Sequence, residues 1–212
     1  MPEHTIISEI AILHVLTWLS PAFPTGAFAY SHGLEWAVEA GLVRDEQGLE
    51  AWLSDLIRHG SFRNDVILLR CAHRGEDVAA LAAALAGSFE RRQETLLQGE
   101  AFAAASAPWG GTEPAALPVA VGRLGARNGT DEDLLALAFL HAFAANLVSA
   151  ALRLIPLGQQ AGLRVLAALE PAILELEKAT RQASSDDLGS FCFQAEIAAI
   201  RHETQYTRLF RS

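Results

Sequence analysis

The sequence predicts an all-α protein with a single domain. Apolar residues recur at helical spacing over nearly the whole chain, and no segment sustains the alternation of a half-buried strand. The 212 residues are 51% hydrophobic and 19% charged, which is enough for one sizeable core and short for two. We therefore expect one domain over residues 1–212, a bundle of roughly ten helices.

Capping and breaking residues place the helices of the first half. Ser8 can cap a helix that ends at Ser20-Pro21, since the residue before a proline is disfavoured in the α region. Pro21 to Gly26 is then a turn. Further helices are expected around 30–40, from Asp45 through Ile57, and over 65–74, 78–86 and 88–105.

The second half begins after the chain's clearest cluster of helix-breaking residues, 107–114, which predicts a surface loop near 106–117. Helices are expected after it over 118–127, 134–155 and 157–181. Pro171 should kink or divide the last of these. The remainder, near 191–212, is polar and predicts an exposed helix followed by an extended end.

The segment Leu134–Ile155 is almost wholly apolar and about as long as a membrane-spanning helix. His141, Asn146 and Arg153 interrupt it, and Asp131 opens an acidic start typical of soluble helices. A central bundle helix is also apolar on all sides, so we predict a core helix and no membrane partner.

The formal net charge of −9 argues against nucleic acid or an anionic membrane surface as partner. Cys71 and Cys192 lie far apart and form no CxxC spacing, which predicts no disulfide framework. Met1-Pro2-Glu3-His4 contains no basic export segment. We therefore expect a cytoplasmic protein.

No motif in the chain predicts catalysis. There is no GxxxxGK[ST] phosphate loop, and His202-Glu203 begins the zinc motif HExxH but has Tyr206 where the second histidine is needed. Cys71 and His73 are two residues apart, so a helix places them on different faces. We expect no enzyme, no cofactor, and neither GTP nor stoichiometric nickel bound by the isolated chain.

Two dense segments remain. The first is a proline-glycine turn that leads into Tyr30-Ser31-His32-Gly33-Leu34-Glu35, and the second is the ending Arg201-His202-Glu203-Thr204-Gln205-Tyr206-Thr207-Arg208-Leu209-Phe210-Arg211-Ser212. Together with Asn146–Ala150, Arg153–Gln159 and Asp186–Ser190, they resemble the UreF family of urease accessory proteins in order and spacing over essentially the whole chain. Departures are confined to places such as His32, Phe191-Cys192-Phe193 and the Trp109 loop.

The resemblance implies an adaptor. UreF-type proteins form homodimers, bind a UreD-type scaffold (UreH in some organisms), and with it recruit the nickel-carrying GTPase UreG to apo-urease, so that their link to nickel is indirect. An alternative is a regulator of GTP hydrolysis by UreG, in which Arg208 would act as an arginine finger. A metal hydrolase is a third class, which the poor ligand spacings disfavour.

The same resemblance gives candidate site residues. Those expected to bind partners are Tyr30, Glu35, Arg201, His202, Glu203, Tyr206, Arg208 and Phe210. Those expected to shape the turn are Pro21, Pro24, Gly26 and Gly33. Each of these expectations has an alternative. The turn can lack a binding role, the helix residues can be ordinary surface residues, and the end of the chain can be a frayed terminus. If the end of the chain is a docking element, removing Thr204–Ser212 should leave stability nearly unchanged, because a polar terminus adds little to the core.

Overall fold

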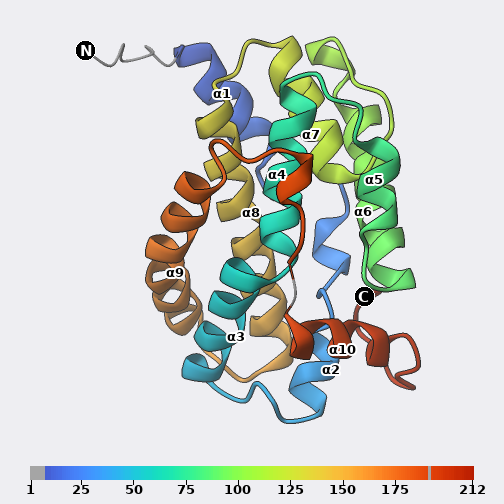
Figure 1. The fold of residues 1–212 in the computed structure, drawn as a ribbon. Coiled ribbons are helices and arrows are strands. Elements are labelled where there is room, and N and C mark those ends of the chain that lie inside the picture. The colour runs from blue at the N-terminus through green and yellow to red at the C-terminus, as the bar shows by residue number, and fades with distance from the viewer. Residues whose placement is uncertain (1–7, 191) are drawn as a thin grey trace.

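The computed structural model describes residues 8–190 and 192–212, and this part of the chain is helical without strands (Figure 1). The Met1–His4 stretch considered above for export, and Phe191, lie outside the described residues. The elements, in chain order, are α1 (Glu9–Trp18), η1 (Ala27–Ala29), α2 (Leu34–Glu39), α3 (Glu46–His59), α4 (Ser61–His73), α5 (Ala79–Ala84), α6 (Phe89–Ala105), η2 (Ala107–Trp109), α7 (Leu117–Arg127), α8 (Glu132–Leu154), α9 (Gln159–Ala179), η3 (Ser185–Asp187) and α10 (Phe193–His202).

The central helix α4 separates two apolar clusters. Its Phe62, Val66 and Leu69 belong to the main core, to which α3, α8 and α9 contribute most. Its residues Ile67 and Leu68 belong to a smaller core with α5 and α7. Because α4 is buried on both sides, the helices around it form one domain, as predicted.

The contact between α4 and α7 depends on a small residue. A Cβ at Gly122 would lie 2.2 Å from the main-chain oxygen of Leu69 and 3.1 Å from Cβ of Ala72. Real Cβ atoms do not approach a backbone oxygen so closely, so any side chain at this position would push the two helices apart. Glycine here sets the spacing at the centre of the fold.

Three of the predicted helix starts are confirmed by their caps, whereas Ser8, which was predicted to cap the first helix, accepts no hydrogen bond with its side chain. Asp45, Ser88 and Asp131 each accept a hydrogen bond from the main-chain N–H three residues later. The helix expected from about Tyr30 instead begins at Leu34, because His32 and Gly33 have φ of 59° and 77°. Left-handed backbone of this kind does not continue a right-handed helix.

The loop predicted near 106–117 contains the short helix η2 and is anchored at its centre. Trp109 packs edge-on against Trp18, and Arg127 Nη1 donates to the main-chain oxygen of Gly110 at 2.7 Å. Asn128 Nδ2 donates to the Trp109 oxygen at 3.1 Å. The loop therefore joins α6 to α7 within one packed unit.

Helix α8 is the one helix of the described residues that is long and apolar enough to cross a membrane. Half of its most apolar stretch is buried inside the molecule. Leu135, Phe139, Leu140 and Leu147 lie in the main core, as predicted for a core helix. Helix α9 contains Pro171 but continues through it to Ala179, so the proline does not divide the helix.

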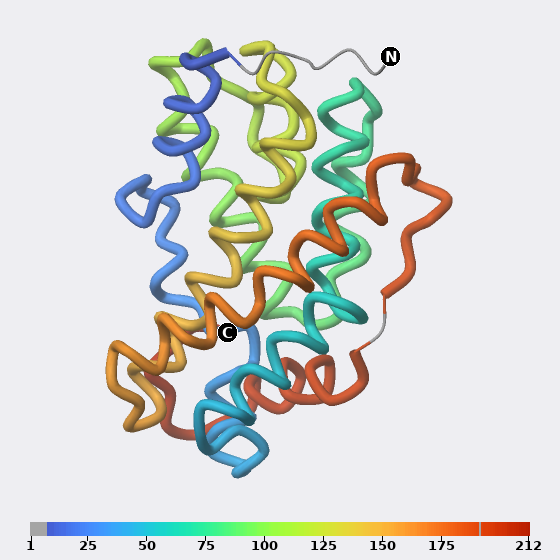
Figure 2. Tube along the Cα trace, turned by 90° about the vertical axis from the view of Figure 1, so that its left-hand side faces the viewer, coloured from blue at the N-terminus to red at the C-terminus, as the bar shows by residue number. Residues whose placement is uncertain are grey.

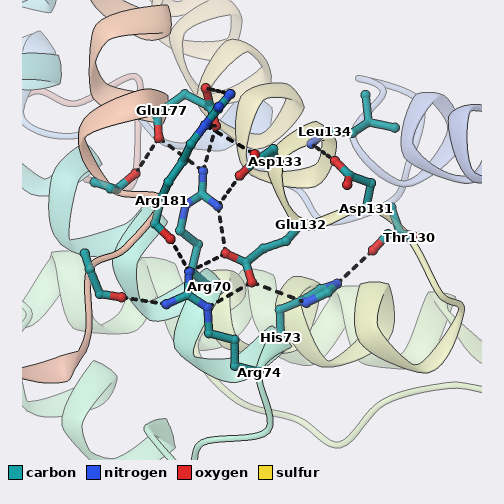
Figure 3. Close-up of polar contacts among 12 residues, drawn as sticks. Arg70, His73, Arg74, Thr130, Asp131, Glu132, Asp133, Leu134, Glu177 and Arg181 are labelled. Carbon is teal, nitrogen blue, oxygen red and sulfur yellow. Dashed lines mark hydrogen bonds and ion pairs between the residues drawn. The ribbon is translucent and has the colours of Figure 1, made fainter. Parts of the chain in front are cut away.

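A fully buried arginine joins α4 to the neighbouring helices α8 and α9 (Figure 3). Arg70 Nη1 lies 2.7 Å from both Glu132 and Asp133, at the start of α8. Arg70 Nη2 donates to the Glu177 carboxylate near the end of α9 at 2.8 Å. Arg74 and Arg181 lie at the edge of the same cluster and pair with Glu132 and Glu177. We call these six residues the Arg70 cluster.

Replacing Arg70 with methionine should strongly destabilise the fold. The change keeps an aliphatic chain but leaves the buried Glu177 carboxylate without its central partner, at a cost of about 3–5 kcal/mol. Arg164→Met, which removes an exposed pair with Glu46, is the matched control and should change stability little. Urea unfolding of both variants is the measurement. Equal midpoints would show that the Arg70 cluster does not hold the helices together.

Candidate functional site

The segment between α1 and α2 has the turn that the sequence predicts. Pro21 and Pro24 are exposed at its surface, whereas Phe23 is buried against Phe102 and Trp109. Gly26, with φ of 74°, leads into η1. The turn thus anchors one aromatic ring in the core and directs the chain towards α2.

Gly33 is required both by its backbone and by its surroundings. Its φ is 77°, and a Cβ there would lie 2.7 Å from the main-chain nitrogen of Ala199 in α10. This close approach lets α10 lie directly beside α2 at one end of the bundle (Figure 1). In addition to the predicted turn, Gly33 therefore allows α10 to pack closely against the start of α2.

The last ten residues, 203–212, form what we call the terminal segment. Figure 2 shows it leaving α10, and its last residues return beside the chain that precedes α2. Arg211 N–H donates to the Ala29 oxygen at 2.9 Å, and Ser31 N–H donates to the Ser212 oxygen at 2.8 Å. Phe210 is buried under the guanidinium of Arg153, whose carbon lies 4.2 Å from the ring centre. The extended end is thus packed into the fold.

Glu35 binds the terminal segment from the first turn of α2. One carboxylate oxygen accepts the Leu209 N–H at 2.6 Å, and the other accepts the Phe210 N–H at 2.9 Å. The second oxygen also lies 3.2 Å from Nε2 of His202. A buried carboxylate is stable only when its oxygens have such donors. Glu35 is therefore one of the residues that hold the terminal segment in place.

His202 connects Glu35 to α6. Its ring is fully buried, and Nδ1 lies 2.6 Å from a Glu90 oxygen on the side opposite to Glu35. Both neighbours are carboxylates, which only accept hydrogen bonds, so the His202 ring lies between two acceptors. The other Glu90 oxygen accepts from Arg208 at 2.6 Å, while Glu203 accepts the Phe89 N–H at the start of α6. These bonds tie α2, α6 and α10 together.

A second buried carboxylate, Glu94, lies one turn further along α6. It accepts the Ser212 hydroxyl at 2.6 Å and pairs with Arg91. Burial would raise the pKa of Glu94, but Arg91, His32 and Ser212 outweigh that effect and lower it to about 2. Burial, together with Arg91, lowers the pKa of His32 to about 4. At neutral pH Glu94 is thus ionised and His32 is neutral, with Nε2 of His32 2.6 Å from the Ser61 hydroxyl.

The predicted partner-binding residues divide into two groups. Tyr30, Glu35, His202 and Phe210 are buried, so they shape the site from within. Arg201, Tyr206 and Arg208 are exposed, and Glu203 is intermediate. The burial of Phe210 and Ser212 contradicts the expectation that the end of the chain adds little to the core. The binding role of these residues stays a prediction.

Three residues of the site were not predicted from the sequence: His32, Glu90 and Glu94. The two glutamates are four residues apart on α6, a spacing that indicates one helix face and that is equally common on solvent-exposed faces. His32 carries a stronger signal, because it precedes a glycine inside a motif. No group of three or more His, Cys, Asp or Glu side chains within the described residues could hold a metal ion.

Glu35→Gln should loosen the terminal segment. The amide keeps one acceptor and turns a donor towards the N–H of Leu209 or Phe210, and a hydrogen bond to a charged group contributes about 1.5–3 kcal/mol. Hydrogen exchange at these two amides should therefore become about 10- to 100-fold faster. Glu50→Gln, on the exposed side of α3 and away from the terminal segment, is the control. Unchanged exchange in a folded Glu35→Gln protein would contradict this role.

Comparison with known proteins assigns the chain to a family. A model described as UreF matches residues 43–170. The chain is 49% identical over 207 residues to a urease accessory protein UreF of Cereibacter sphaeroides, covering 95% of this chain and 99% of that protein. It is 47% identical to one of Bradyrhizobium sp. (98% and 95% covered) and 48% identical to one of Rhizobium etli (95% and 96% covered). With the two sequence motifs brought together at one end of an all-helical fold, the chain belongs to the UreF family of urease accessory proteins.

Proposed function

We propose that this protein is a non-catalytic adaptor in urease maturation. In this role it binds a UreD-type scaffold in the cytoplasm and with it recruits a UreG-type GTPase to apo-urease for nickel insertion. The near full-length similarity to proteins named urease accessory protein UreF supports the pathway. The adaptor role rests on an interaction surface, for which the structure provides two candidates.

The first candidate, the exposed loop 206–209, is the observation that carries the proposal. Tyr206 is fully exposed, and Leu209 is 64% exposed although its own N–H is held by Glu35. Arg208 lies between them with its guanidinium partly exposed. Aromatic, arginine and leucine side chains held on a fixed backbone lose little conformational entropy on binding. The hydrogen bonds of the buried Glu35 and Glu90 therefore hold the loop in one conformation before a partner binds.

The second candidate is the outer face of α1. Ala11, Val15 and Trp18 turn inward, while Ile10, Leu13 and Leu16 are exposed on the other side. A surface helix that is apolar on both faces usually covers its outer face against another chain. We propose this face as the contact between two copies of the protein, in line with a mean hydropathy of +0.21 for the chain.

The alternative function, regulation of GTP hydrolysis by Arg208 as an arginine finger, fits the geometry less well. Arg208 already forms a 2.6 Å ion pair with Glu90. Reaching into another protein's active site would break this pair and leave Glu90 to His202 alone. An adaptor needs only the exposed surface of the loop, so the adaptor role is the better supported.

Leu209→Ala and Tyr206→Ala should each weaken association with the UreD-type or UreG-type protein. Truncating an interface anchor costs about 1–3 kcal/mol, which corresponds to about a 5- to 150-fold loss of affinity. The measurement is a pull-down of tagged protein against each partner separately and together, followed by titration. Leu163→Ala, a leucine on α9 with a similar exposure of 60%, is the control. Full recruitment of both partners by the Tyr206/Leu209 double variant would exclude the loop as a docking surface.

Charge placed on the outer face of α1 should prevent dimer formation. Leu13→Glu and Leu16→Glu would each bury a carboxylate in the proposed contact, whereas Leu97→Glu on α6 would not. Light scattering at tens of micromolar should give a dimer for the unaltered protein and Leu97→Glu, and a monomer for the two α1 variants. A monomer in every case, with the UreD-type partner absent or present, would refute the homodimer.

A further inference from the structure

A cavity of about 340 Å³ lies between α4, α6 and α10, apart from the exposed loop and from α1. The connection between α5 and α6 and the start of α7 complete its walls. Glu196 and Ile200, one turn apart on α10, line one side, and Asp65 on α4 lies on another. None of the sequence motifs that identify the family supplies its charged groups, which are Asp65, Arg91 and Glu196.

The lining combines aliphatic walls with carboxylates. Leu68, Leu85, Pro118 and Ile200 provide the apolar surface. Asp65 and Glu196 provide two carboxylates, and within the described residues neither carboxylate forms a hydrogen bond or an ion pair. The cation that acts on both is Arg91, whose charge lowers the pKa of Asp65 and of Glu196 without a direct ion pair.

The single arginine of the cavity serves three acids, so it does not balance all of their charge. Arg91 pairs with Glu94, whose pKa is lowered to about 2 and which is therefore ionised at all ordinary pH values. Burial raises the pKa of Asp65 to about 6, against the opposing effect of Arg91, and burial likewise raises the pKa of Glu196. At neutral pH the cavity therefore has an excess of negative charge.

The carboxylate of Glu196 lies close to the backbone of a glycine. A Cβ at Gly87, in the connection between α5 and α6, would lie 1.9 Å from a carboxylate oxygen of Glu196. The backbone at Gly87 thus lies against this carboxylate, and a side chain there would displace it. Both the glycine and the acid lie on the cavity wall.

We propose that this cavity binds an alkyl cation, an ammonium or guanidinium group on an aliphatic stem. The cationic end would pair with Asp65 and Glu196, and the stem would lie against Leu68 and Ile200, as lysine and arginine side chains do on apolar surfaces. An anion would face two unpaired carboxylates and is disfavoured. The cation is either a free small molecule or a side chain of another protein. The inference does not depend on the role in urease maturation.

Butylguanidinium and butylammonium are the probes, with butylurea as the uncharged control of the same length. Calorimetry at pH 7.5 should show binding of the two cations with a dissociation constant of about 1 mM or tighter, and markedly weaker binding of butylurea. Asp65→Asn and Glu196→Gln should each weaken cation binding about 10-fold. Glu100→Gln, an exposed acid on α6, is the matched control and should bind like the unaltered protein.

A pH series and a peptide complete the test. The other titratable groups around the cavity are Arg91, Glu94, Glu196 and His32. With pKa values of about 2 and about 4, Glu94 and His32 keep their charge states between pH 5 and 7.5, and burial raises the pKa of Glu196 in the same direction as that of Asp65. Binding should therefore weaken at pH 5, and less so in Asp65→Asn. Acetyl-Ala-Arg-Ala-amide distinguishes the sources: binding equal to butylguanidinium favours a protein side chain, and its exclusion favours a free ligand. No binding of either cation, or undiminished binding to a folded Asp65→Asn protein, would overturn the proposal.

Discussion

A positive charge with no access to water, that of Arg70, determines how the central helices pack. A guanidinium in this position is stable only if carboxylates are brought to it, and they come from the start of α8 and the end of α9. Apolar packing alone is tolerant of small shifts between helices, whereas hydrogen bonds of 2.7–2.8 Å are not. The Arg70 cluster therefore fixes the register of α4 against two neighbouring helices, α8 and α9.

At the other end of the bundle the same principle operates with the opposite charge. Glu35 is a buried anion, and its donors come from the terminal segment and from His202. The buried and the exposed residues of this region therefore have different roles. The buried residues of the two motifs hold the backbone of the terminal segment. The side chains of Tyr206, Arg208 and Leu209 extend from this backbone into the solvent. A single surface loop without this support would be mobile and would bind more weakly.

The helical architecture could be predicted because its signals are local. Asp45, Ser88 and Asp131 mark helix starts through bonds that span three residues. The start of α2 could not be predicted from the sequence. His32 adopts a left-handed backbone conformation there, and the conformational preference of histidine gives no reason to expect it. For the site, the sequence motifs include Glu35 and His202, but the burial of these two residues was not predicted. Charged residues are usually exposed, so there was no reason to expect these two inside the protein. Glu35 and His202 are also 167 residues apart, and a periodic pattern in the sequence cannot reveal a contact over that separation.

The way the terminal segment is held has a consequence for the order of folding. Ser31 and Ser212 are 181 residues apart, and Glu35 and Phe210 are 175 apart. Contacts so distant carry a large loop-closure entropy and form after the local helices and their packing. Until then Glu35 remains hydrated and the loop 206–209 has no fixed backbone. Competence to dock would thus arise only in the last step of folding, so that a partner selecting this loop would also select chains whose core is complete.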